Sequence, residues 1–115
     1  MSVSGSGDSY TATVNGVRFR FLLDSGADRV FFTRADARRL GFDPAQLTYD
    51  HTYSTWGGMV SGASVRLREV RIGGFIARNV VAAIDDTPDD MRLLGASMLK
   101  LLHFELVNGS CVLSW

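Results

Sequence analysis

The sequence predicts a single, mainly β domain with one or two short helices. Glycine is frequent, at 12 residues, while proline is scarce, at 2. The apolar runs are short, rich in Val, Phe, Ile and Tyr, and separated by glycine-bearing turns, which is typical of strands. A length of 115 residues fits one domain that builds its own core.

Turn and cap signals place the elements expected in the first half of the chain. Asn15-Gly16 supplies the two positive-φ residues of a type I′ hairpin turn. Thr33 can cap a short helix that Gly41 ends. At Leu22 the apolar-polar alternation of the second strand stops, so we expect this strand to enter the interior. The expected strands are 10–14, 17–23, 29–32 and 47–53, and the expected helix is 33–40.

The second half predicts more strands and one further helix. Gly73-Gly74 joins two long strand candidates. Asn108-Gly109 joins two shorter ones with the turn chemistry of the first hairpin. The expected strands are 60–70, 75–84, 104–107 and 111–113, and the expected helix is 96–102.

Composition argues against several classes of protein. Hydrophobic residues make up 46% and charged residues 21% of the chain, which is typical of a globular domain rather than a disordered one. Twelve basic residues balance twelve acidic ones, so net charge does not favour a nucleic acid partner. Cys111 is the single cysteine, which excludes an intrachain disulfide and, with two histidines, a usual zinc site. We expect a buried, inert thiol and no metal or cofactor.

The amino-terminal segment leaves the localisation open. No apolar run reaches the roughly 18 residues that a membrane span needs, so we expect none in this chain. Residues 1–8 are mostly small and are rich in serine and glycine, and we expect a flexible tail before one domain over 9–115. The protein would be cytoplasmic if the chain is complete, and extracytoplasmic if an upstream membrane anchor has been removed.

An acidic residue directly follows the second strand, in the run Phe21-Leu22-Leu23-Asp24-Ser25-Gly26-Ala27. A carboxylate after a segment that is apolar on both faces is costly unless it is hydrogen-bonded or partnered. One interpretation is structural, with Asp24 forming an Asx-turn that ends the strand. The other is catalytic, and the tripeptide alone does not decide between them.

Three segments together resemble the retropepsin-like aspartic proteases, the retroviral type, and particularly their small bacterial members. They are residues 22–27, then Trp56-Gly57-Gly58 where this family has a flap, then Leu93-Leu94-Gly95 before the second expected helix. The resemblance runs from about residue 14 to 115. It implies a closed, barrel-like retropepsin-type acid protease fold in which the third segment passes beneath the catalytic strand.

The resemblance also implies an activity and its residues. Aspartic proteases activate a water between two carboxylates that share one proton. The chain has no second Asp-Ser/Thr-Gly, so a second Asp24 must come from another copy across a two-fold axis. We therefore expect a homodimeric aspartic endopeptidase that binds extended peptides. The expected catalytic residues are Asp24, Ser25 and Gly26, and the expected substrate-binding residues are Ala27, Thr55, Trp56, Gly57 and Gly58.

The main alternative is a catalytically silent, dimeric peptide-binding or adaptor module on the same fold. A hydrolase triad of Ser25, an aspartate and either His51 or His103 is weaker, because no Gly-x-Ser-x-Gly turn presents the serine. Residues 104–115 are apolar and end the chain as a strand, and we expect another subunit to cover its edge.

Two further motifs have ordinary structural explanations. Residues 85–90 carry four aspartates, but their spacing misses the EF-hand calcium loop, and we expect a solvated loop. Asn108-Gly109-Ser110 matches a glycosylation acceptor, yet the hairpin turn already explains it.

Overall fold

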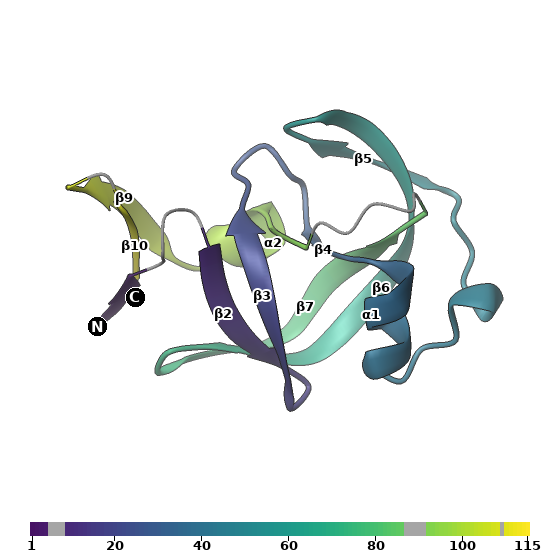
Figure 1. Ribbon diagram of the computed structural model, residues 1–115, viewed down its shortest axis with the longest axis horizontal. Coiled ribbons are helices and arrows are strands. Elements are labelled where there is room, and N and C mark those ends of the chain that lie inside the picture. Colours follow the sequence, from purple (N-terminus) through teal and green to yellow (C-terminus); the bar gives the residue numbers. More distant parts are fainter. Residues whose placement is uncertain (5–8, 87–91, 109) are drawn as a thin grey trace.

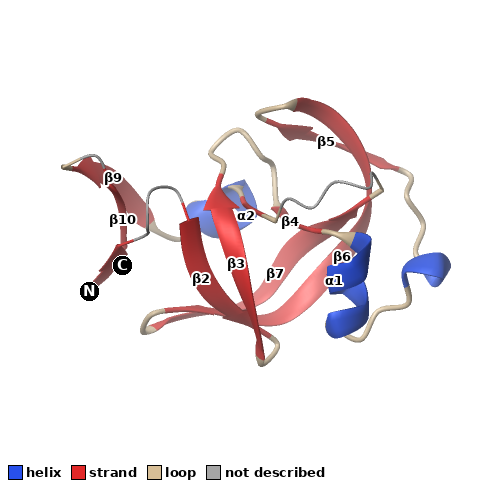
Figure 2. Cartoon of the chain, viewed as in Figure 1, coloured by secondary structure: helices blue, strands red, loops and turns tan. Residues whose placement is uncertain are grey.

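The computed structural model is built mostly of strands, with short helices between them (Figure 2). It describes residues 1–4, 9–86, 92–108 and 110–115. None of the helices in these residues is long and apolar enough to cross a membrane. In chain order the elements are β1 (Ser2–Ser4), β2 (Ser9–Val14), β3 (Val17–Leu23), β4 (Val30–Phe32), α1 (Arg34–Arg39), the 3-10 turn η1 (Pro44–Gln46), β5 (His51–Thr55), β6 (Gly58–Ile72), β7 (Phe75–Asp85), β8 (Leu93–Leu94), α2 (Ala96–Leu99), β9 (His103–Val107) and β10 (Ser110–Ser114).

The main sheet curls until its two sides meet (Figure 1). Among the described residues its strand order is β2-β3-β8-β4-β7-β6-β5. A further antiparallel pairing of β2 with β6, through Thr13↔Arg71 and Val14↔Val70, joins the sheet into a ring. The mainly β fold class predicted from the sequence is confirmed, and the ring encloses the apolar core.

The predicted first hairpin forms with the predicted turn. Asn15 and Gly16 have φ values of 49° and 84°, as a type I′ turn requires. Alternate residues of β3 enter the core, where the rings of Phe19 and Phe21 pack edge-on against Phe32 at 5.2 and 5.4 Å. Period-two alternation and turn chemistry therefore suffice to predict this part of the fold.

Helix α1 also follows its predicted signals. Thr33 Oγ1 accepts from the Asp36 N–H at 3.1 Å, and the Asp36 carboxylate accepts from the Thr33 N–H at 3.2 Å, which completes a capping box. Gly41 follows the helix with a φ of 89°. Asp36 is buried and forms an ion pair with Arg92 Nε at 2.6 Å, so α1 is tied to the segment that precedes β8.

The short strand β8 positions the residues that follow β3. It lies between β3 and β4, pairing Leu22↔Leu93 and Leu23↔Leu94 in parallel with β3 and Phe31↔Leu93 antiparallel with β4. The backbone N–H of Asp24 then donates to the Leu94 carbonyl at 3.1 Å. The segment 93–94 therefore threads beside the end of β3, as the resemblance implies.

Two predicted elements are shorter than expected. The strand expected over 47–53 begins only at His51. Before it, the Tyr49 hydroxyl donates to the Pro44 carbonyl at 2.9 Å and its ring lies under the Arg34 guanidinium, so residues 47–50 fold against η1 and α1. The helix expected over 96–102 ends at Leu99. The N–H groups of Leu101 and Leu102 then donate to carbonyls three residues back, which are tighter turns than those of an α-helix.

Two further expectations differ from the structure. Leu22 is 40% exposed, so the outer face of β3 stays at the surface at this point, although Asp24 is buried. Residues 2–4, expected within a flexible tail, form β1 and pair antiparallel with β10. Residues 5–8 lie outside the described residues.

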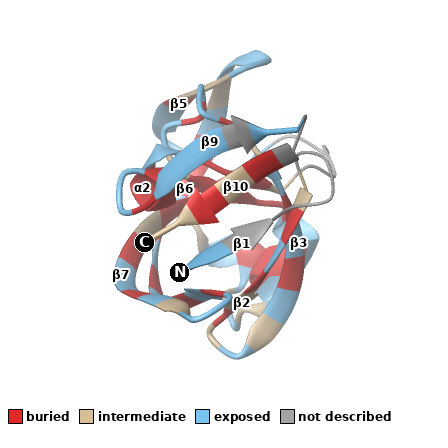
Figure 3. Cartoon of the chain, turned by 90° about the vertical axis from the view of Figure 1, so that its left-hand side faces the viewer, coloured by how far each residue is buried: buried red, intermediate tan, exposed pale blue. Residues whose placement is uncertain are grey.

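A second sheet, of order β1-β10-β9, lies beside the ring (Figure 1). Cys111 and Leu113 on β10 are buried in the same core as β2, and the Tyr10 hydroxyl donates to the Cys111 carbonyl. The expected buried cysteine is confirmed. On the outer side, β9 is largely exposed (Figure 3), with Phe104 at 49% and Val107 at 43%.

Candidate active site

Asp24 is a buried carboxylate at the turn between β3 and β4. Asp24 is only 5% exposed. The Gly26 N–H donates to Asp24 Oδ1 at 2.9 Å, and the Ala27 N–H donates to the Asp24 carbonyl at 3.1 Å. The Asx-turn of the structural interpretation is therefore present. It uses one carboxylate oxygen and leaves Oδ2 for another contact.

The β5–β6 hairpin supplies that second contact. Trp56 and Gly57 form its tip, and the Trp56 backbone N–H donates to Asp24 Oδ2 at 3.1 Å. Figure 1 shows this hairpin arching over the loop that joins β3 to β4. The Trp56 side chain itself is 77% exposed, so the backbone of the tip, rather than the indole, touches the carboxylate.

Two further hydrogen bonds hold the same hairpin along β5, away from its tip. Asp28 donates its backbone N–H to the Ser54 carbonyl at 3.0 Å, and its Oδ2 accepts from the Ser54 N–H at 2.6 Å. Beside them Tyr53 is buried, its ring packing edge-on against Phe31 at 5.6 Å with the Arg29 guanidinium over it at 4.9 Å. The hairpin is therefore held against the Asp24 loop at its tip and along β5.

Two glycines allow the backbone segments of the site to approach closely. A Cβ on Gly95 would lie 2.1 Å from the Arg29 carbonyl oxygen and 2.7 Å from that of Ala27. A Cβ on Gly26 would meet Asp24 Oδ1 at 3.3 Å and the Trp56 backbone at 3.5 Å. The Ala96 N–H donates to the Ala27 carbonyl at 2.8 Å just after Gly95, which completes this packing.

The structure brings most of the predicted site residues to one place. Ser25 and Gly26 are exposed at the Asp24 turn, while Thr55 donates its hydroxyl to the Gly58 carbonyl at 2.7 Å and so braces the hairpin tip. Gly58 has a φ of 118°, which favours glycine at the start of β6. Ala27 is buried, and both of its backbone polar groups bond within the chain.

The weaker candidates lie in other settings. His51 pairs through Nδ1 with Asp50 at 2.8 Å and stacks on Tyr53, and His103 lies on β9 in the second sheet. Within the described ranges, which stop at residue 86 and resume at 92, the side chains form no cluster suited to a metal ion. Part of the acidic loop, Asp89 and Asp90, and part of the glycosylation motif, Gly109, lie outside those ranges.

Sequence reasoning missed the residues that fasten the hairpin. Asp28 and Ser54 lie 26 positions apart and meet only in the folded chain. The one available signal is the charged pair Asp28-Arg29 between two apolar segments. Sequence reasoning assigned no separate role to Tyr53, although its buried ring packs against Phe31 beneath the hairpin.

A family model described as aspartyl protease matches residues 10–98 of this chain. The chain belongs to the aspartyl protease family. A crystal structure of a retropepsin-like aspartic protease from Rickettsia conorii superposes with a TM-score of 0.80 at 27% identity, covering 98% of this chain and 87% of that one. The resemblance to the retropepsin-like family is confirmed.

A viral protease structure and two uncharacterized proteins are also similar to this chain. EIAV protease in complex with an inhibitor superposes with a TM-score of 0.61 at 22% identity, covering 80% of this chain and 84% of that one, and this likeness shows the fold alone. Uncharacterized proteins of a Sinorhizobium species and of Rickettsia prowazekii are 39% and 38% identical over 81% and 84% of this chain. The chain spans only 40% and 42% of their lengths.

Proposed function

We propose that two copies of this chain form an aspartic endopeptidase in which the two Asp24 carboxylates activate one water. The observation that carries this proposal is Asp24 itself, a buried carboxylate at an exposed turn with Oδ2 directed at a hairpin tip. Family membership supports a protease, and Asp24 lies within residues 10–98, which the aspartyl protease family model matches. Asp24 is therefore the residue on which the proposal depends.

The chemistry requires both carboxylates. Two carboxylates about 3 Å apart share one proton, because both cannot ionise together at that distance. The ionised Asp24 takes a proton from the water as the water attacks the peptide carbonyl, and the protonated Asp24 gives its proton to the carbonyl oxygen. A proton then passes to the leaving nitrogen as the C–N bond breaks. Each carboxylate acts in turn as base and as acid.

The hairpin tip takes part as a flap. In the single chain the Trp56 N–H occupies Asp24 Oδ2, so the tip must lift before water and peptide can reach the carboxylate. The substrate then lies extended beneath the flap and pairs with backbone groups as an added strand. Thr55, Trp56, Gly57 and Gly58 are the flap residues expected to contact it.

Exposed groups on the single chain support a dimer. Ser25 is exposed beside the buried Asp24, where it could bond to the partner's equivalent loop. Phe104 and Val107 present apolar surface on β9, an open edge of the second sheet. Both features fit a two-fold interface that covers β9 and brings the two Asp24 turns together.

A peptide-library digest by the wild-type protein and by Asp24→Asn tests the proposal. We expect the wild type to cleave library peptides and Asp24→Asn to be inactive while still folded and dimeric. The rate should pass through a maximum at acidic pH, because the pair must hold one proton and lack the other. A rate that climbs steadily above about pH 8, where histidine is neutral, would instead support a serine triad.

The alternative of a silent binding module is distinguished by the same digest. The bond from Trp56 to Asp24 Oδ2 favours this alternative, because a covered carboxylate cannot activate water. A wild-type protein that binds library peptides and cleaves none, with Asp24→Asn binding equally well, would establish the binding module and overturn the protease.

A further inference from the structure

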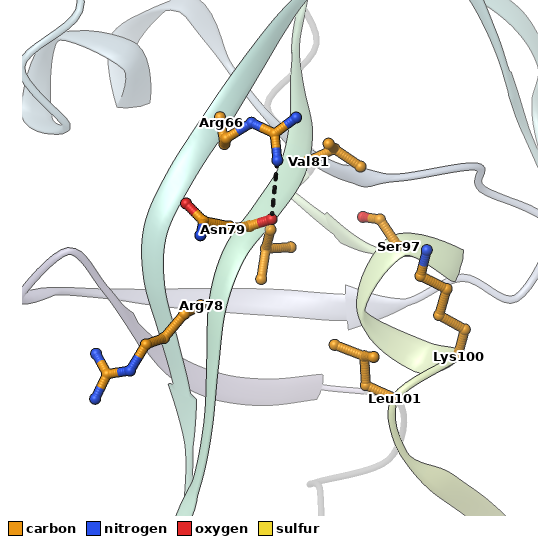
Figure 4. Close-up of a pocket in the computed structure, with 8 residues that line it drawn as sticks. Arg66, Arg78, Asn79, Val81, Ser97, Lys100 and Leu101 are labelled. Atoms are coloured by element: carbon orange, nitrogen blue, oxygen red, sulfur yellow. Dashed lines mark hydrogen bonds between the residues drawn. The ribbon is translucent and has the colours of Figure 1, made fainter.

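A pocket separate from the Asp24 turn lies between the β6–β7 hairpin and α2 (Figure 4). Its volume is about 320 Å³, at the small end of ligand pockets, so it suits one or two side chains rather than a cofactor. Arg66 and Arg78 come from the hairpin, while Ser97 and Lys100 come from α2 and the residue after it. Neither the flap nor Asp24 contributes to its lining.

The charges that line this pocket are all positive. Arg66, Arg78 and Lys100 contribute cations, and none of the described lining residues is acidic. Arg78 is already paired, because its Nη1 lies 3.3 Å from Glu69 Oε1 and its side chain points away from the pocket in Figure 4. The hydrogen bond from Arg71 chiefly lowers the pKa of Glu69, so Glu69 is ionised and offsets Arg78. Two cations, Arg66 and Lys100, remain for a ligand.

These two cations face the pocket from its two sides. In Figure 4 the Lys100 amine lies beside Ser97 on the α2 side, and the Arg66 guanidinium lies on the hairpin side, near Asn79 and Val81. Arg66 Nη1 donates to the Asn79 carbonyl at a long 3.5 Å, which orients the guanidinium and leaves its other N–H groups free for an acceptor. Asn79 has a φ of 54° within β7, a conformation that asparagine tolerates better than most residues.

Polar and apolar groups complete the lining. Ser97 is buried, and its Oγ accepts from the Val30 N–H at 3.0 Å, which holds the oxygen at the pocket wall and leaves the hydroxyl proton to donate. Val81 and Leu101 supply apolar surface next to it, and Leu101 is 47% exposed. Two cations, a hydroxyl group and an apolar surface together suit a carboxylate on a peptide segment that also carries apolar side chains.

We propose that this pocket binds an acidic peptide segment, with one carboxylate between Arg66 and Lys100 and a neighbouring apolar side chain on Val81 and Leu101. A guanidinium and an ammonium give charge-assisted bonds to a carboxylate. The apolar surface favours a peptide over a small inorganic anion, because only the peptide can cover it. This binding does not depend on cleavage at Asp24.

The test measures binding of a fluorescent hexapeptide of alternating glutamate and leucine by fluorescence anisotropy. All proteins carry Asp24→Asn, so that no cleavage interferes. Matched peptides replace glutamate by glutamine, or leucine by serine. We expect Arg66→Gln and Lys100→Gln each to weaken binding about fivefold, the range of a partly exposed ion pair, and both matched peptides to bind more weakly. Arg38→Gln is the control, because Arg38 is an exposed arginine on α1.

Lys100 provides an independent readout, because it is the only lysine of the chain. Reductive ¹³C-methylation keeps its charge and gives one side-chain NMR signal besides that of the amino terminus. We expect the acidic peptide to shift the Lys100 signal and inorganic phosphate at the same concentration to leave it in place. Equal loss of binding in Arg38→Gln, equal binding of the glutamine peptide, or an unshifted Lys100 signal would each overturn the proposal.

Discussion

Gly95 illustrates how one residue can position the site without any chemistry of its own. It follows β8 at the point where three backbone segments cross, and a methyl group there would lie 2.1 Å from the Arg29 carbonyl oxygen. Real Cβ atoms do not approach backbone so closely, and backbone cannot move aside as a flexible side chain can. The glycine in Leu93-Leu94-Gly95 is therefore a packing requirement of the Asp24 loop.

Gly95→Ala should destabilise the fold by about 3 kcal/mol or more, at or beyond the upper end of ordinary overpacking. The matched control is Gly57→Ala, because a Cβ at Gly57 meets only Thr55 Oγ1, at 3.8 Å. Urea unfolding of the two variants measures the difference. Equal midpoints for Gly95→Ala and the wild type would show that the β8 crossing is looser than the structure describes.

Tyr53 makes the opposite prediction, a substitution that stabilises. Its hydroxyl is buried and has no hydrogen-bond partner among the described residues. A buried, unpaired polar group costs about 1–3 kcal/mol, so Tyr53→Phe should stabilise the closed hairpin by about 1 kcal/mol. For a domain of this size we expect a Tm increase of about 4 °C. A lower Tm in Tyr53→Phe would mean that the hydroxyl does have a partner.

At the scale of elements, local signals predict local structure well. Asn15-Gly16 fixes the first hairpin and Thr33 with Asp36 caps α1, because the required atoms lie within a few residues of one another. The exposure of Leu22 and the late start of β5 depend on neighbours that meet only in the folded chain. The same division holds at the site, where the motif predicts Asp24 and only the fold reveals Asp28 against Ser54.

The flap hairpin should loosen when its lower fastening is removed. Asp28→Ala deletes the carboxylate that accepts from the Ser54 N–H at 2.6 Å. A hydrogen bond to a charged group contributes about 1.5–3 kcal/mol, so exchange of the Ser54 amide should accelerate roughly tenfold or more. Asp50→Ala is the control, because Asp50 is exposed beside His51 on the same hairpin arm. Unchanged Ser54 exchange in Asp28→Ala would contradict the fastening.

At the scale of the whole molecule, two exposed features bear on the proposed assembly. Phe104 and Val107 are exposed on β9, and Ser25 is exposed beside the buried Asp24. Deleting residues 111–115 would be a poor test of assembly, because Cys111 and Leu113 are part of the core of the chain itself. A test of the shared site must leave the fold intact and count active sites.

Dimers that combine wild-type and Asp24→Ala chains allow the active sites to be counted. Asp24→Ala removes the carboxylate but keeps the packing around it, so wild-type and variant chains should pair at random when equal amounts are unfolded and refolded together. About one quarter of the dimers then carry two Asp24 residues, and about half carry one. If water activation needs both carboxylates, the activity per dimer should fall to about a quarter of the wild-type value. Independent sites, one in each chain, would retain about half, because half of all chains would still carry Asp24. A value near one half would therefore assign catalysis to the single chain and end the case for a shared pair.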